Sequence, residues 1–232
     1  SDLWVAKFEA SNSGGKIKIV PGVQSWRDIT VNDIYTNCLN YNKTLNSHMM
    51  KNDEWGAVAY LSKSKYGKQN EEVWINNSSS YITGSAGNSA SAGSNEGTTN
   101  DYTSTQGVKA STTGTVYGVY DMSGGAWEYV AACYTGSTDK LTENSNYINR
   151  YIDVYDNYSF KKYGDAIFET SSDSNGTTSW FEDYSRLANE VYPLFLRGGY
   201  NVNALQAGLL SFSPYDGSGV EFAGFRPVCV VK

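Results

Sequence analysis

A long polar segment divides this chain and constrains its fold more than any other feature. Residues 76–116 consist mainly of Asn, Ser, Gly, Thr and Ala, with only isolated larger apolar side chains such as Tyr81, Ile82 and Tyr102. A segment of this composition buries too little apolar surface to fold by itself, and it is typical of a linker or of a loop. We interpret it as a long ordered loop packed on one domain, which spans residues 1–232.

The charge balance argues against two classes of partner. Lys and Arg number 18 and Asp and Glu 24, so the formal net charge is -6 and the pI is about 4.8. Nucleic acids and anionic membrane surfaces both select clustered Lys and Arg, and we therefore expect neither as a partner. The most apolar run, Trp55 to Leu61, is far shorter than the ~18 residues of a membrane span, which predicts no membrane insertion.

The remaining composition indicates a binding protein outside the cell. Charged residues make up only 18% and aromatic residues 14%, led by 19 Tyr, beside many Asn, Ser and Gly. The chain starts with Ser1, Asp2 and Leu3, without an initiator Met or a signal peptide, and we interpret it as a mature or trimmed fragment. We expect any anchor or export signal upstream, and an extracellular, cell-surface or phage-particle location.

The residues that most often carry chemistry are few. Cys38, Cys133 and Cys229 form no Cys-x-x-Cys pair, which excludes a zinc knuckle, and we interpret them as small buried hydrophobic residues. His48 is the only histidine, so a hydrolase triad would have to use it. We interpret it as a partly buried residue with one local hydrogen bond. We expect no catalytic residue, no cofactor and no metal.

The acidic residues of the second half form no recognisable metal loop. The run from Asp173 to Gly176 resembles a calcium loop but lacks a third acidic ligand and a closing Glu, so it predicts a polar turn. Asp153, Asp156 and Asp165 are expected on a solvated, Tyr-rich loop.

Apolar periodicity predicts two short helices. Between Thr30 and Leu45 the apolar residues recur at helical spacing, and Thr30 is suited to cap the first turn. From Lys51 to Ser62, Trp55 shares one face with apolar residues at helical spacing. The Trp55 face is expected in the core.

The rest of the chain predicts short strands and irregular segments. Residues 3–23 read as a β-hairpin closed by Pro21 and Gly22, and residues 118–130 as two strands around a tight Ser-Gly-Gly turn. Further strands are predicted at residues 195–199, 207–212 and 225–231, whereas residues 134–192 show no sustained period. The predicted class is α+β, with two short helices, short antiparallel strands and long ordered loops.

Three segments together resemble one known group of proteins. They are Ser47 to Tyr60, Val119 to Tyr129, and Leu196 to Gly199 combined with Gly224 to Val228. These segments are similar to the helix, the strand pair and the C-terminal motifs of the formylglycine-generating-enzyme (sulfatase-modifying factor) branch of the C-type lectin fold. The resemblance covers over three quarters of the chain, from Lys51 to the C-terminus, and implies a C-type-lectin-like domain with neighbouring termini.

The chain departs from these enzymes where their chemistry lies. The enzymes use two nearby thiols close to the C-terminus, where this chain has Cys229 alone, and one histidine is too few for the iron site of the related oxygenases. An Asn that binds calcium in the enzymes is Gly125 here. The resemblance is closer to the variable proteins that retroelements diversify in bacteria and phages.

The resemblance implies where ligand would bind. In the variable proteins, binding residues lie between the Arg-Gly-Gly and Gly-Phe-Arg motifs, which bracket residues 200–223 of this chain. This window follows neither a strand nor a helix period. The candidate ligand-binding residues are chemically diverse, as in a paratope, and they are Tyr200, Val202, Asn203, Leu205, Gln206, Ser211, Ser213, Tyr215, Asp216, Val220, Glu221 and Phe222.

We expect a non-catalytic receptor-binding or adhesin domain whose partner is a protein or glycan on a host or neighbouring cell. The alternatives are an oxidoreductase like the formylglycine-generating enzymes and a structural pilin-like or phage decoration domain. A structural role is predicted for Trp55, Trp127, Glu128, Arg197 and Arg226. In particular, Glu128 is expected to form a buried, hydrogen-bonded Glu–Arg pair with one of the arginines that flank the window, Arg197 or Arg226, which clamps the terminal strands.

Overall fold

The computed structural model describes residues 2–94, 99–156, 163–172 and 175–231. The helices are α1 (Val31–Tyr41), α2 (Asn52–Lys63) and α3 (Ser145–Tyr151). The strands are β1 (Asp2–Val5), β2 (Ser11–Ser13), β3 (Lys16–Lys18), β4 (His48–Met49), β5 (Trp127–Tyr134), β6 (Asp153–Tyr155), β7 (Asn175–Gly176), β8 (Ser185–Arg186), β9 (Leu194–Gly198), β10 (Gly208–Tyr215), β11 (Ala223–Gly224) and β12 (Pro227–Val231).

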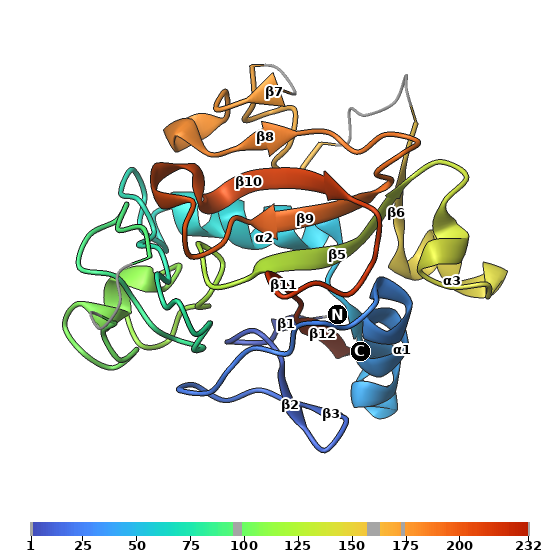
Figure 1. Cartoon of the computed structure of the whole chain (residues 1–232), viewed down its shortest axis with the longest axis horizontal. Coiled ribbons are helices and arrows are strands. Elements are labelled where there is room, and N and C mark those ends of the chain that lie inside the picture. The colour runs from blue at the N-terminus through green and yellow to red at the C-terminus, as the bar shows by residue number, and fades with distance from the viewer. Residues whose placement is uncertain (1, 95–98, 157–162, 173–174, 232) are drawn as a thin grey trace.

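The largest sheet confirms the α+β class but not the predicted strand directions. Its order is β11-β5-β9-β10-β8-β7, and β6 also pairs with β5 (Figure 1). The central pairs β5–β9 and β9–β10 are antiparallel, whereas β11–β5, β5–β6 and β10–β8 are parallel. The expectation of short antiparallel strands is therefore wrong at these three pairs, and β5 and β10 reach eight residues each.

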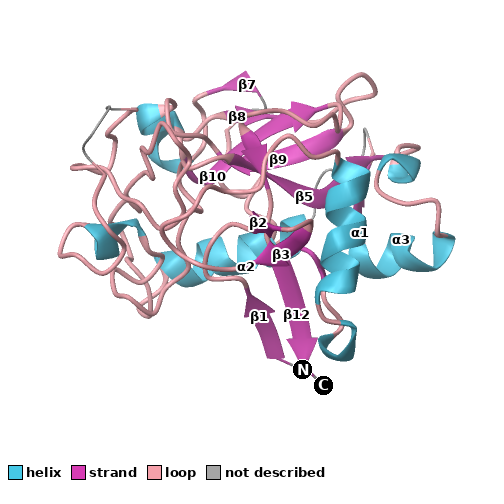
Figure 2. Cartoon of the chain, turned by 60° about the horizontal axis from the view of Figure 1, so that its bottom comes forward, coloured by secondary structure: helices cyan, strands magenta, loops and turns pink. Residues whose placement is uncertain are grey.

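The two ends of the chain lie side by side, as Figure 2 shows. Strand β1 pairs with β12 in antiparallel register from Asp2–Val231 to Val5–Val228, and β12 also pairs with β4. The predicted hairpin over residues 3–23 is wrong, because β1 joins the C-terminal strand and the hairpin consists of β2 and β3 alone. Its turn is at Gly14 and Gly15, which both have positive φ.

The two predicted helices are confirmed, with α1 ending a few residues earlier than expected. The Thr30 side chain accepts a hydrogen bond from the Asp33 backbone at 3.3 Å and so caps α1. In α2 the apolar face is buried, with Trp55 and Ala59 completely inaccessible. The seven-residue α3 lies in a stretch predicted as irregular, because so short a helix leaves little periodic signal.

Strand β5 separates two hydrophobic cores, since its side chains alternate between the two faces of the sheet. Tyr129 and Ala131 pack with α1 on one face. Val130 and Ala132 pack with α2, which crosses behind the sheet in Figure 1, on the other. All eight residues of β5 are buried.

The long polar loop packs against the N-terminal segment. Phe8, Ala86, Ala110 and Tyr120 form a small third core, and Ala86 and Asn100 pair across the loop. Residues 118–122, which were predicted as a strand, instead form a loop in which Asp121 has a positive φ of 63°. The second predicted strand of that pair is β5.

Candidate ligand-binding surface

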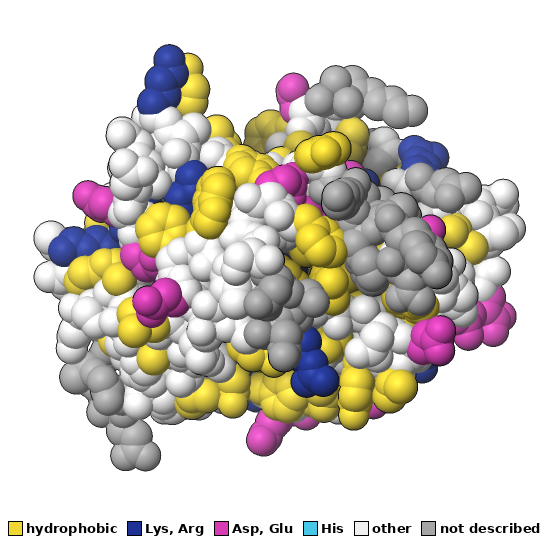
Figure 3. Space-filling model, turned by 90° about the horizontal axis from the view of Figure 1, so that it is seen from above, with side chains coloured by type: hydrophobic (Ala, Val, Ile, Leu, Met, Phe, Trp, Pro, Cys, Tyr) yellow, Lys and Arg dark blue, Asp and Glu magenta, His cyan; other side chains and the backbone are white. Residues whose placement is uncertain are grey.

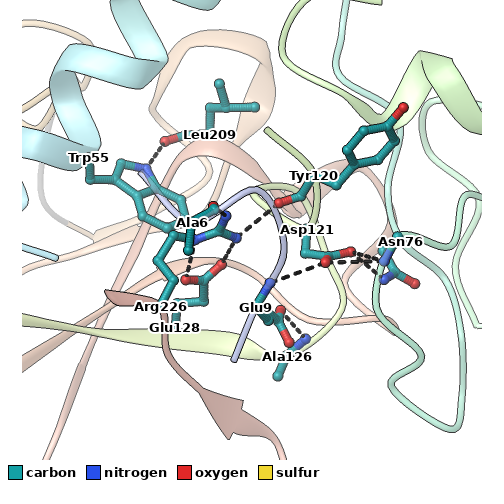
Figure 4. A network of polar contacts seen from close by, with 11 residues as sticks. Ala6, Glu9, Trp55, Asn76, Tyr120, Asp121, Ala126, Glu128, Leu209 and Arg226 are labelled. Carbon is teal, nitrogen blue, oxygen red and sulfur yellow. Dashed lines mark hydrogen bonds and ion pairs between the residues drawn. The ribbon is translucent and has the colours of Figure 1, made fainter. Parts of the chain in front are cut away.

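A buried ion pair joins Glu128 to Arg226, which follows the window of residues 200–223 in the chain. The Nε of Arg226 donates to Glu128 Oε2 at 2.7 Å, and its Nη2 donates to the other carboxylate oxygen (Figure 4). The same guanidinium donates to the backbone oxygens of Ala6 and Tyr120, both at 2.9 Å. This geometry confirms the predicted pair of Glu128 with Arg226, which ties β5 to the start of β12 and to the N-terminal segment.

Arg197, the other arginine that flanks the window, does not pair with Glu128. Arg197 and Glu128 lie directly opposite each other in the β5–β9 register, yet their hydrogen-bond partners differ. Arg197 donates to Asn52 Oδ1 at 3.1 Å and to the backbone oxygens of Asp165, Ala166 and Leu209 at 3.0 to 3.3 Å. It therefore binds neutral oxygens rather than a carboxylate.

The acidic residues around these arginines are buried. Asp153 and Asp165 are 6% and 0% exposed, so their expected place on a solvated loop is wrong. Burial raises the pKa of Asp165 to about 6, and its Oδ2 accepts a hydrogen bond from the Tyr155 hydroxyl at 2.7 Å. Residues 173–174 of the expected polar turn lie outside the described residues.

Near Arg226, two further acids are buried beside Glu128. Burial and the neighbouring carboxylate of Glu128 raise the pKa of Glu9, whose Oε1 accepts from the Ala126 backbone at 3.0 Å. Asp121 accepts from Asn76 Nδ2 at 2.8 Å. Within the described ranges, no group of three or more His, Cys, Asp or Glu side chains has an arrangement that could hold a metal ion.

Gly125 precedes β5 and lies against the Glu9 carboxylate. Its φ is +72°, and a Cβ at this position would lie 2.7 Å from Glu9 Oε1. A larger residue at this position would therefore require the Glu9 side chain to shift.

The other candidate chemical residues are enclosed. His48 is buried with both ring nitrogens engaged, Nε2 at 2.7 Å from Glu54 Oε1 and Nδ1 at 2.9 Å from the Asn46 oxygen, so it has one more partner than predicted. The three cysteines are free thiols; Cys38 and Cys133 are buried and Cys229 is half-buried. Burial raises the pKa of Cys38 and of Cys229, which disfavours the reactive thiolate.

The window combines a strand with exposed turns. Strand β10 runs through its middle and confirms the strand predicted at residues 207–212, and Ser211 is completely buried and cannot reach a surface ligand. The exposed candidates are Val202, Leu205, Gln206, Asp216 and Glu221. The half-buried candidates are Tyr200, Asn203, Ser213, Tyr215, Val220 and Phe222.

Three aromatic residues from different parts of the window gather in one place. The ring centroid of Phe222 lies 5.8 Å from that of Tyr200 and 5.5 Å from that of Tyr215. In addition, the Tyr215 ring meets Tyr129 of β5 edge-on at 6.3 Å. The rings are thereby supported by buried strands rather than by loops alone.

These rings line a surface hollow of about 440 Å³, which we call the aromatic hollow. Four of the candidate residues line it, namely Tyr200, Ser213, Tyr215 and Phe222. The remaining walls are Trp127, Arg186, Tyr192, Leu196 and Pro214. Its size lies in the range of pockets that bind small molecules or single anchor side chains.

Sequence reasoning missed most of those walls. Strand alternation places Leu196 on the same face as Trp127, a signal that the residues themselves contain. Arg186 and Tyr192, in contrast, lie in a stretch without periodicity, and only the pairing of β8 with β10 brings Arg186 to the hollow.

Among the described residues, Arg186 is the only charged side chain that lines the aromatic hollow. It is exposed and forms no ion pair with any residue that the structure describes. A guanidinium beside rings suits a ligand with an acidic or acceptor group next to an apolar face.

Asn203 and Asp216 serve the loops that carry the rings. Asn203 Oδ1 accepts from the Tyr200 backbone at 2.8 Å, and Asp216 Oδ1 accepts from the backbone and hydroxyl of Ser218 at 2.9 and 2.7 Å. These bonds lower the pKa of Asp216, the bond from the Ser218 backbone most strongly. Both side chains hold turns and therefore have less freedom to bind ligand than Ser213.

On the face seen from above, acidic and basic side chains are interspersed among hydrophobic and uncharged side chains (Figure 3). Among the described residues, no helix combines the length and apolar character needed to cross a membrane.

Comparisons with known proteins find distant structural similarity alone. No protein-family model and no curated protein matches this chain. The solved structure of PvdO from Pseudomonas aeruginosa aligns with 96% of this chain and 71% of its own, at 13% sequence identity and a TM-score of 0.41.

Proposed function

We propose that this chain is a non-catalytic ligand-binding domain that uses the aromatic hollow and the exposed turns of residues 200–223 as its binding surface. One observation carries the proposal. Tyr200, Tyr215 and Phe222 are far apart along the window, yet their rings meet and line one hollow. Aromatic side chains supply large contact area at low entropic cost, as in antibody paratopes.

The rigidity of the surrounding fold supports this role. β9 and β10 are paired from Leu196–Ser213 to Leu194–Tyr215, and the two window ends adjoin the buried Arg197 and Arg226. A ligand that meets a preformed surface orders few side chains on binding, which favours affinity.

The proposal also rests on the sequence resemblance to the retroelement-diversified variable proteins. That resemblance implies one domain with a C-type-lectin-like fold of the formylglycine-generating-enzyme type. Eleven of the twelve candidate residues are exposed or half-buried, as diversified positions must be to meet a ligand. The location is extracellular, on a cell surface or on a phage particle. The ligand is a protein or a glycan, and neither nucleic acid nor membrane insertion is expected.

Sequences of the encoding locus and its flanks from several isolates test diversification. We expect a downstream near-copy of the last coding segment that differs mainly at adenines, and codon differences at Tyr200, Ser213, Tyr215 and Phe222. Ser211 serves as the internal control, because a completely buried residue should not vary. An invariant window without such a copy would remove the diversification claim and leave an adhesin of fixed specificity.

Binding itself is tested on intact cells with fluorescently labelled domain and flow cytometry. Tyr215→Ala should reduce binding at least about tenfold, the effect of a contact worth about 1.4 kcal/mol or more. The matched control is Tyr66→Ala, which removes a side chain that is 70% exposed and outside the hollow. Equal binding by the two variants would show that the hollow is not the binding site.

A structural role in an assembly is the second candidate, and two exposed side chains favour it. Val202 and Leu205 are 50% and 56% exposed within the same window. Side chains of this kind are typical of subunit contacts when they gather in a patch. Size-exclusion chromatography at rising concentration decides between the two, since an oligomer that Leu205→Asp abolishes would favour assembly over adhesion.

A further inference from the structure

A second surface hollow lies beside the β2–β3 hairpin, and we propose that it binds a sugar residue of a glycan. Its volume is about 580 Å³, and it is enclosed by the β2–β3 hairpin and the segment of residues 20–28. β2 and β3 lie at the bottom of Figure 1, apart from β10. The two hollows share no lining residue, so the inference does not rest on the proposed function. We call this second site the polar hollow.

A buried hydroxyl without a partner points to a ligand. Ser25 lines the polar hollow and is only 5% exposed, yet its Oγ has no hydrogen-bond partner among the described residues. Its backbone nitrogen donates to the Tyr81 oxygen at 3.0 Å, which holds the residue in place. Buried polar groups are almost always hydrogen-bonded, and a rotation of the Ser25 side chain toward the hollow would give this enclosed Oγ a partner on an entering group.

The walls match a polyhydroxylated ligand. Ser11, Asn12, Ser13 and Gln24 surround Ser25 with hydroxyl and amide groups, which both donate and accept hydrogen bonds. Sugar hydroxyls have the same dual character. Trp26 adds a half-buried ring to the wall, against which the apolar face of a pyranose can pack.

The charges of the polar hollow argue against a simple anion. Arg27 and Lys18 are its cations, but Asp28 lies in the same wall. The guanidinium of Arg27 is engaged in part, because it stacks 4.1 Å from the Tyr81 ring centroid and its Nη1 donates to the Glu221 backbone oxygen, while its Nε has no partner among the described residues. The Asp28 carboxylate would repel a phosphate or carboxylate in this wall, whereas it can accept hydrogen bonds from the hydroxyls of a neutral sugar.

The polar hollow is tied to the ligand-binding window. Asp28 donates its backbone nitrogen to the Val220 oxygen at 3.0 Å, and Arg27 binds Glu221. The next residue, Phe222, lines the aromatic hollow. An oligosaccharide held in the polar hollow would thus lie beside the loop whose composition sets the specificity of the window.

A glycan array probed with the labelled domain, followed by calorimetry with the strongest-binding free oligosaccharide, tests the proposal. Ser25→Ala removes an unpartnered hydroxyl, so it should leave the melting temperature unchanged and weaken binding about three- to tenfold, the effect of one hydrogen bond. Gln24→Trp, at an exposed position of the same wall, should fill the hollow and abolish binding.

Ser62→Ala is the matched control, because Ser62 is 1% exposed, its Oγ also lacks a partner among the described residues, and it lies on α2 away from the polar hollow. Weaker binding by both polar-hollow variants and not by Ser62→Ala would support the proposal. Binding that depends on Tyr215 but on neither Ser25 nor Gln24 would place the glycan in the aromatic hollow and overturn it. An array on which no oligosaccharide binds would overturn it too, while protein ligands of the window remain testable on cells.

Discussion

Two completely buried arginines, Arg197 and Arg226, flank the window and differ in the kind of group to which they donate hydrogen bonds. Arg226 forms a two-bond ion pair with Glu128, and the attraction of that carboxylate raises its pKa despite burial. Arg197 binds only neutral oxygens among the described residues, and burial lowers its pKa to about 10. Similar glycine-flanked motifs thus give one arginine a carboxylate partner and the other only neutral partners. We call the contacts of Arg226 the charged joint and the contacts of Arg197 the neutral joint.

The difference teaches what each joint connects. Arg226 joins segments that are remote in sequence, Ala6 and Tyr120 as well as Glu128, and so closes the fold around its two termini. Arg197 donates hydrogen bonds to backbone oxygens of the loop of residues 165–166 and to the backbone oxygen of Leu209 in the window. Its role is to place the start of β10 against that loop and α2.

The largest expected effect breaks the charged joint. Glu128→Ala leaves the buried Arg226 guanidinium without its carboxylate, and it should lower the free energy of unfolding by about 3–5 kcal/mol. Urea denaturation measures the loss, with Glu143→Ala, which removes an exposed carboxylate, as the control. Wild-type stability of Glu128→Ala would show that the pair does not hold the terminal segments.

A smaller effect is expected at the neutral joint. Arg197→Met keeps most of the side-chain volume and strands no charge, but it leaves Asn52 and three backbone oxygens without this donor, at a cost of about 2–3 kcal/mol. Arg226→Met also strands the Glu128 carboxylate and should cost more, about 3–5 kcal/mol. Equal losses in the two variants at one pH would contradict the distinction between the joints.

The smallest effect concerns pH. Because the native pKa of Asp165 is raised to about 6 from 3.8, the native state holds this proton to a higher pH than the unfolded state does. Its contribution to stability is therefore present below pH 4 and declines as the pH rises to 6, by about 1 kcal/mol between pH 5 and pH 7.

Asp165→Asn should remove that decline, because an amide does not titrate. Denaturation at pH 5 and pH 7 measures it, with Asp139→Asn at an exposed position as the control. If the difference in stability between the two pH values is the same in Asp165→Asn as in the wild type, Asp165 does not titrate as assigned.

Local patterns predicted the parts of this molecule that local forces form. The cap at Thr30 and the buried Trp55 face follow from helical spacing, which a side chain satisfies within its own helix. The burial of Glu128 beside Trp127 was also predictable, since a carboxylate within a buried strand needs a cation. Which arginine would supply that cation was not predictable, because Arg197 lies opposite Glu128 in the β5–β9 register, whereas Arg226 forms the pair from the segment before β12.

The sequence by itself determined helices α1 and α2, the α+β class, the buried pairing of Glu128 with an arginine, and the aromatic residues of the window. Only the tertiary structure decided that β1 joins β12, that Ser211 is buried, and that Arg186 and Tyr192 complete the aromatic hollow. The physical reason is that periodicity and capping act over a few residues, whereas strand partners and surface hollows depend on contacts between segments far apart in the chain.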